Sequence, residues 1–76
     1  MKTKSLDECK SFISQITKLL ANEHKRSPYN FSIEFISDYI NRDINGLVKM
    51  YNLTDAQKSS ISNHAKHCID AFCKTN

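Results

Sequence analysis

The fold is decided by residues 32–51, which read SIEFISDYINRDINGLVKMY. Large apolar side chains recur in this stretch every three or four residues, which is the period of one face of an α-helix. They are Ile33, Ile36, Ile40, Ile44, Leu47 and Tyr51. Ser32 directly precedes the row and belongs to the residue types that cap the start of a helix. The stretch therefore predicts a helix that buries one face in a core.

Two interpretations of this stretch stay open, because its centre is rich in weak helix formers. Asn41, Asp43, Asn45 and Gly46 all lower helix propensity, which favours two helices separated by a turn near residues 41–43. The apolar row, however, keeps its phase from one end to the other, and a turn would normally reset that phase. We favour one continuous helix and keep the broken form as the alternative.

Upstream of this stretch, a helix is predicted for about residues 6–24. Ser5 and Glu8 have the spacing of a capping box, in which two side chains satisfy free amides at the helix start. Pro28 stops the helix, because the residue before a proline avoids helical geometry. Ser14 and Thr17 fall opposite an apolar row that we expect to face the core. This row is Leu6, Cys9, Phe12, Ile13, Ile16, Leu19 and Leu20.

Downstream, a third helix is predicted for about residues 55–73. Thr54 and Gln57 form a second capping box at its start. Its apolar row is Ile61, Ala65, Cys68, Ile69 and Phe72. The chain has 76 residues with one glycine and one proline, which is too few turn residues for a β-sandwich or a barrel. We therefore predict a single all-α domain, a small antiparallel three-helix bundle with helices near 6–24, 32–51 and 55–73.

Composition narrows the class of partner and the compartment. The formal net charge is +3, from eleven basic and eight acidic residues, which is less basic than a dedicated nucleic-acid binder. No apolar run approaches the length of a membrane span, and Asp7, Glu8 and Lys10 stand where a signal peptide would have its apolar stretch. Three cysteines, an odd number, suit a reducing compartment. We expect a cytoplasmic protein that does not engage a membrane.

The histidines and cysteines offer a weak metal site. His64 and Cys68 are four residues apart and share a helix face, as two zinc ligands would. Further ligands would have to be His24, Cys9 or Cys73. In an up-down-up bundle, however, the first and third helices run parallel, which places Cys9 at the opposite end from Cys73. We expect Cys68 to be a small core residue beside His64, and no bound metal or cofactor.

Catalysis is not expected either. One glycine cannot make a glycine-rich phosphate loop. Cys68 beside His64 could be drawn as a nucleophile with its base, but a reactive thiolate needs a partly exposed pocket, and Cys68 lies in the apolar row. Three short helices leave little room for a cleft. We predict that the chain is not an enzyme and takes no small-molecule substrate.

A second apolar row on the central helix is the most informative feature for function. Phe35, Tyr39 and Met50 line up with Gly46 between them, about 110° around the helix from the isoleucine row. This row either packs on a second neighbouring helix or stays exposed as an interface. Aromatic residues, Met and Arg are enriched in protein interfaces, and Arg42 lies at its rim. We predict a binding module for a protein partner, or a homodimer, that uses Phe35, Tyr39, Met50 and Arg42.

The alternative function depends on the broken form of the central helix. Two short helices joined near 41–43 resemble a helix-turn-helix in outline. A nucleic-acid-binding regulator of this type would use Arg42, Asn45, Lys49 and Asn52, which share the outward face. Asp38 and Asp43 bring negative charge to that surface, which opposes phosphate binding. Nucleic acid is therefore the second expectation, behind protein.

Overall fold

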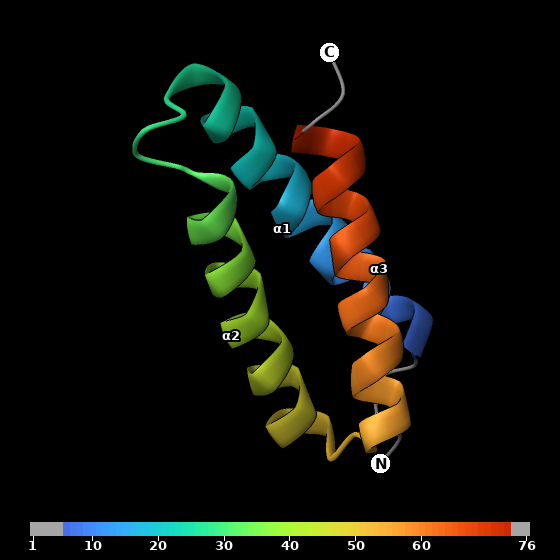
Figure 1. Cartoon of the computed structure of the whole chain (residues 1–76). Coiled ribbons are helices and arrows are strands. Elements are labelled where there is room, and N and C mark those ends of the chain that lie inside the picture. The colour runs from blue at the N-terminus through green and yellow to red at the C-terminus, as the bar shows by residue number, and fades with distance from the viewer. Residues whose placement is uncertain (1–5, 74–76) are drawn as a thin grey trace.

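The structure is a computed structural model that describes residues 6–73, and these residues form three α-helices and no strand. The helices are α1 (Leu6–Arg26), α2 (Ile33–Tyr51) and α3 (Asp55–Cys73). Successive helices run in opposite directions, so that α1 and α3 point the same way (Figure 1). The predicted three-helix bundle is confirmed; α1 ends two residues later than predicted and α2 begins one residue later. The capping box predicted at Ser5 lies outside the described residues.

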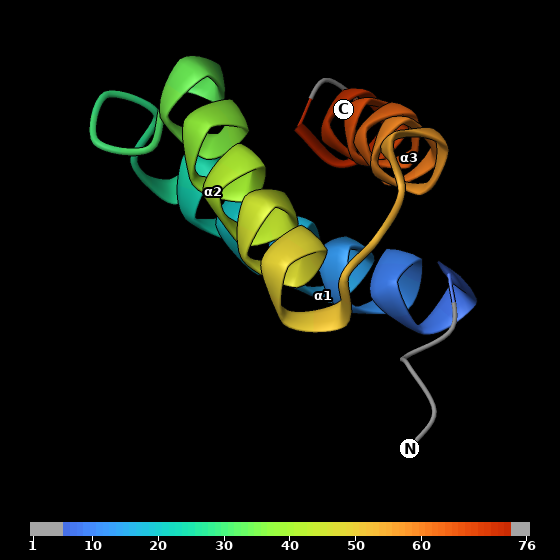
Figure 2. The ribbon, with the colours of Figure 1, turned by 90° about the horizontal axis from the view of Figure 1, so that it is seen from below.

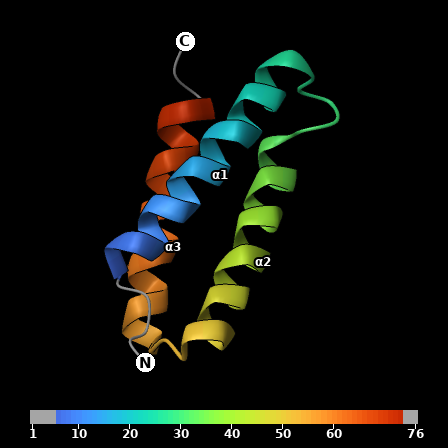
Figure 3. The same cartoon turned by 180° about the vertical axis from the view of Figure 1, so that it is seen from behind.

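The helices pack as a triangle rather than as a flat layer. Viewed along the long direction of the molecule, each helix occupies one corner (Figure 2). Viewed from behind, α1 runs obliquely across the other two: its first half lies over α3, and its last turns reach the start of α2 (Figure 3). α1 accordingly packs more extensively against α3 than against α2. Within residues 6–73, no helix combines the length and the apolar character needed to cross a membrane.

The central helix is continuous from Ile33 to Tyr51, so the form broken near 41–43 is wrong. The Ser32 hydroxyl caps its start by accepting a hydrogen bond from the Phe35 amide at 3.1 Å. Asn52 caps its end in the left-handed conformation, with φ 53° and ψ 51°, and Asn tolerates this geometry better than most residues. Burial of one whole face offsets the weak propensity of the middle of the helix.

Side chains fix both links between helices. His24 Nδ1 donates to the Phe31 carbonyl at 2.7 Å, which ties the end of α1 to the residues that enter α2. The second link is closed by the predicted capping box. Its two bonds are reciprocal: the Thr54 amide donates to Gln57 Oε1 at 2.9 Å, and the Gln57 amide donates to Thr54 Oγ1 at 3.2 Å.

The core follows the predicted apolar rows on α2 and α3. Ile36, Ile40 and Ile44 are at most 1% exposed, and they lie at the centre of the cluster that joins all three helices. Ile61 and Ile69 of α3 face them. The long isoleucine row of α2 therefore contacts both neighbours with a single face.

The prediction for α1 was wrong in part. Its buried residues are Cys9, Ile13, Thr17 and Ala21, so Thr17 lies in the core and not opposite it. The Thr17 hydroxyl satisfies itself within the helix by donating to the Ile13 carbonyl at 2.7 Å, which makes its burial tolerable. Phe12 and Leu19, which we expected in the core, are exposed instead. Because α1 crosses the bundle obliquely, residues four apart along it face the core. Phe12 and Leu19 therefore lie outside the buried face of the helix.

Ile40→Ala should lower the free energy of unfolding by roughly 2–5 kcal/mol, the usual cost of truncating a large buried side chain. Urea unfolding of the dilute protein measures this. Met50→Ala removes a side chain of similar size from an exposed position of the same helix, and it should change stability by less than about 0.5 kcal/mol. Equal effects of the two substitutions would contradict the burial pattern of α2.

Candidate functional site

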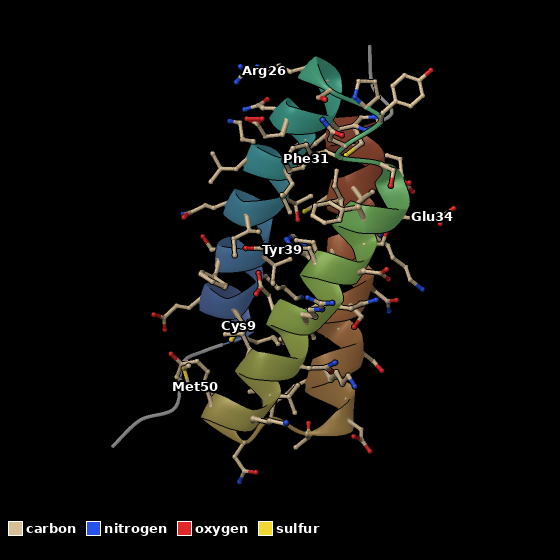
Figure 4. All side chains as sticks on the ribbon, turned by 90° about the vertical axis from the view of Figure 1, so that its left-hand side faces the viewer. Cys9, Arg26, Phe31, Glu34, Tyr39 and Met50 are labelled. Atoms are coloured by element: carbon tan, nitrogen blue, oxygen red, sulfur yellow. The ribbon has the colours of Figure 1, made fainter. Side chains whose placement is uncertain are left out.

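The second apolar row of α2 is exposed. Phe35 and Tyr39 each keep 44% of their surface accessible, and Met50 keeps 71%. Arg42, on the same side of the helix, is also exposed. Figure 4 shows Tyr39 and Met50 on the edge of α2 that borders α1. Neither neighbouring helix covers the row completely. The row is therefore exposed, and it is not packed on a second helix.

The structure adds two residues to this surface that the sequence reasoning had placed in the core. Phe12 is 40% exposed and Leu19 is 66% exposed, and both lie on the edge of α1 away from α3. The position of Ser14 shows this, because Ser14 points to α3, where its hydroxyl contacts His64, and it lies roughly 160° around the helix from Phe12. The signal that could have found them is the excess of apolar residues on α1, which is more than one helix face can bury.

The exposed apolar residues of α1 and those of α2 both lie away from α3. On α2, the side that meets α3 carries Ser37 and Asn41, which line a small hollow with Ala65 and Lys66. The exposed row of α2 lies across the buried isoleucines from that hollow, on the side next to α1. Both exposed edges therefore lie on the part of the bundle away from α3. We call this surface the apolar face, and its members are Phe12, Leu19, Phe35, Tyr39 and Met50.

Ring contacts organise the upper part of the apolar face. Phe31 packs edge-on against Phe35, with ring centroids 5.5 Å apart, and Phe35 packs against Tyr39 at 6.3 Å. The hydrogen bond from His24 to the Phe31 carbonyl therefore also positions the Phe31 ring, the first in this series of ring contacts. Such contacts restrict the rotamers of the rings before any partner arrives.

One carboxylate at the α1–α2 seam lacks a charge partner. Burial raises the pKa of Asp43 above its ordinary value of 3.8. Within residues 6–73, the side chains of Asp43 and its neighbour Arg42 make no hydrogen bond or ion pair. Arg26 and Glu23, by contrast, form an ion pair at 3.4 Å on the surface of α1. The Asp43 carboxylate is thus partly removed from water, and within the described residues no cation or hydrogen-bond donor compensates for this.

A polar cluster links α1 to α3 at the rim of the core, and the sequence reasoning found only part of it. His64 and Cys68 share a face as predicted, with Cys68 Sγ 3.5 Å from His64 Nε2. Ser14, 50 residues away from His64, completes the cluster: its hydroxyl lies 2.6 Å from His64 Nε2 and 3.3 Å from Cys68 Sγ. The three groups satisfy one another, and Cys68 is only 7% exposed. This arrangement stabilises the register of the two helices.

The remaining candidate ligands do not join this cluster. His24 is engaged with the Phe31 carbonyl, and Cys9 is buried near the start of α1, at the far end from Cys73. Between Leu6 and Cys73, no three His, Cys, Asp or Glu side chains lie close enough together to hold a metal ion.

The residues foreseen for nucleic acid are exposed as a group but are not basic as a group. Arg42 and Lys49 share the outward face of α2 with Glu34 and Asp38, which cancel their charge. Asn45 lies exposed on the same face. Asn52 has a structural role at this site, because it ends α2 in the left-handed conformation.

The raised pKa of Asp43 predicts the direction in which the stability of the fold changes with pH. The folded chain binds the Asp43 proton more tightly than the unfolded chain does. The charged carboxylate therefore lowers the free energy of unfolding, and this penalty disappears as the pH falls and the group is protonated. Asp43→Asn should therefore raise the free energy of unfolding of the dilute protein at pH 7, by at most about 1 kcal/mol because the group is partly hydrated. Urea unfolding at pH 7 and at pH values below the pKa should show the gain disappear on acidification.

Asp38→Asn, at an exposed position of the same helix, is the matched control and should give a smaller change. A loss of stability at neutral pH in Asp43→Asn would contradict the absence of a partner.

The chain matches no protein-family model, no curated protein and no solved structure. The apolar face and the Ser14 cluster are therefore the features from which a function can be inferred.

Proposed function

We propose that this chain is a small, non-catalytic binding domain that recognises a protein partner through the apolar face. The observation that carries the proposal is the exposure of five large apolar side chains from two helices on one side of the bundle. Single exposed apolar residues are ordinary, whereas a contiguous group marks an interaction surface. Four of the five are aromatic residues or methionine, the types enriched at protein interfaces.

The size of the apolar face suits a protein contact. A fully exposed side chain of this size presents about 200 Å², so the observed exposures correspond to roughly 500 Å² on one chain. That is near the upper end of the apolar patches found on monomeric proteins. A further ring of polar surface around it would reach the ~800 Å² that each partner buries in a standard interface.

The apolar face is also partly organised in advance. The ring contacts from Phe31 through Phe35 to Tyr39 hold three aromatic side chains in a row, from the link before α2 into its first turns. Rigid aromatic side chains lose little conformational entropy when a partner covers them. This arrangement favours Phe35 and Tyr39 as anchors and Met50 as an adaptable contact at the other end.

The thiols support a reducing compartment. Cys9, Cys68 and Cys73 are not joined in disulfides, and Cys9 and Cys68 are buried in separate parts of the core. Free thiols persist where the surroundings are reducing. We place the binding domain in the cytoplasm on this ground.

In dilute solution, where the chain is monomeric, Tyr39→Glu should leave the helicity and the thermal midpoint near those of the wild type, because Tyr39 is already half open to water. Ile40→Glu should unfold the chain, since a buried unpaired charge costs several kcal/mol. Circular dichroism of both variants measures the contrast. If Tyr39→Glu unfolds the chain as thoroughly as Ile40→Glu, the row is core and the proposal fails.

Binding itself can be read by photocrosslinking in the source cells, with a benzoylphenylalanine residue in place of Leu19. We expect a discrete protein adduct that disappears when Tyr39→Glu is added. The control places the same probe at Asn45, which is exposed on the outward side of α2, and should give no such adduct. Adducts that persist in Tyr39→Glu, or that form equally from position 45, would contradict binding through the apolar face.

Nucleic acid is the second candidate. The continuous α2 removes the helix-turn-helix on which it was first based, so it now rests only on the exposure of Arg42 and Lys49 on one side of α2. A titration of mixed duplex DNA at low salt separates the two. We expect weak binding at most, because two cations beside two carboxylates neutralise few phosphates. Tight binding that falls steeply with salt, and that Arg42→Ala and Lys49→Ala each weaken, would reverse the order of the candidates.

A further inference from the structure

We propose that the partner of the apolar face is a second copy of this chain, with the two α2 helices packed side by side across Gly46. This inference rests on the proposed function and names its partner. Three observations support it. Gly46 has no structural role within the described part of the monomer, the side chains of Arg42 and Asp43 form no ion pair there, and α1 lies beside them on one side of α2 only.

Gly46 lies in the middle of α2, where glycine weakens a helix relative to alanine. Nothing inside the chain requires glycine there. Its φ is not positive, and a methyl group added to it would meet no atom within 4 Å. By the helical advance, Gly46 lies between Tyr39 and Met50, within roughly 40° of each. A second helix can approach the α2 backbone most closely at this point, so the contact between chains explains the glycine.

The charges beside Gly46 complement a copy of themselves. Arg42 and Asp43 lie on opposite sides of a line along α2 through Gly46, at roughly 40° and 60° from it. Neither makes an ion pair within the described part of the chain. When two copies are related by a two-fold axis parallel to α2, each Arg42 lies next to Asp43 of the other copy. The carboxylate that the monomer leaves half-buried and unpaired then gains a cation.

The position of α1 selects this parallel arrangement. α1 borders α2 on the side that carries Asp43, across the buried row from Ser37 and Asn41. An antiparallel pair would bring both copies of α1 to the same side of the contact, where they would collide. A parallel pair places them on opposite sides, each next to the partner's α2. Phe12 and Leu19 then also contact the partner, so that all five members of the apolar face are covered.

Charge reversal tests the pairing directly. Sedimentation equilibrium should show that the wild-type chain dimerises and that Arg42→Asp and Asp43→Arg each weaken dimerisation at least tenfold. An equimolar mixture of the two variants should associate again, because one carries two acids and the other carries two arginines at the contact. Lys66→Asp makes the same charge change as Arg42→Asp at an exposed position of α3 and should leave the dimer intact.

Dimerisation that neither reversal weakens, or a mixture that does not recover, would overturn the inference. So would a wild-type chain that stays monomeric up to about 1 mM. If such a monomer still tolerates Tyr39→Glu without unfolding, the apolar face serves a different protein, and only the identity of the partner is wrong. If Tyr39→Glu unfolds the chain, the proposed function fails as well.

Gly46→Ala separates the contact from the fold. Alanine strengthens a helix, so the thermal midpoint of the dilute monomer should rise, while dimerisation should weaken at least tenfold because the methyl group holds the helices apart. Asn45→Ala is the matched control: it also strengthens the helix, but it lies exposed away from the contact and should leave dimerisation unchanged. A Gly46→Ala chain that dimerises as tightly as the wild type would overturn the contact at Gly46.

Discussion

The burial of one isoleucine row on α2 is the constraint on which the rest of the structure depends. Ile36, Ile40 and Ile44 lie almost without exposure between α1 and α3. Their burial holds α2 helical through a middle segment that contains Asn41, Asp43, Asn45 and Gly46, all poor helix formers. Tertiary burial therefore outweighs local propensity.

The continuity of α2 has a direct consequence for function. A break near residue 42 would have rotated the second half of the helix relative to the first. Because the helix is unbroken, Phe35, Tyr39 and Met50 stay aligned on one edge. Their alignment produces an apolar face opposite α3, which three short helices cannot cover themselves. The same interaction thus stabilises the domain and leaves a surface for a partner.

The sequence predicted the parts of the molecule that local periodicity controls. The three helices, the caps at Ser32 and Thr54, and the second row of α2 all follow from spacing and capping chemistry. The inward face of α1 did not follow, because it depends on the angle at which α1 crosses the bundle. That angle buries Thr17 and exposes Leu19, although residue type alone suggests the reverse. The bond of Ser14 to His64 was likewise out of reach, since it joins segments 50 residues apart.

The buried row of α2 stabilises the bundle, and we propose that its apolar face joins two copies of the chain. A dilution series of amide NMR spectra tests it most directly, because each residue reports its own contacts. We expect concentration-dependent changes in amide chemical shift that are confined to α2 between Phe35 and Met50 and to the edge of α1 around Phe12 and Leu19. Shifts centred instead on Ser37, Lys66 and Ile69, along the α2–α3 hollow, or no shifts at any concentration, would contradict it.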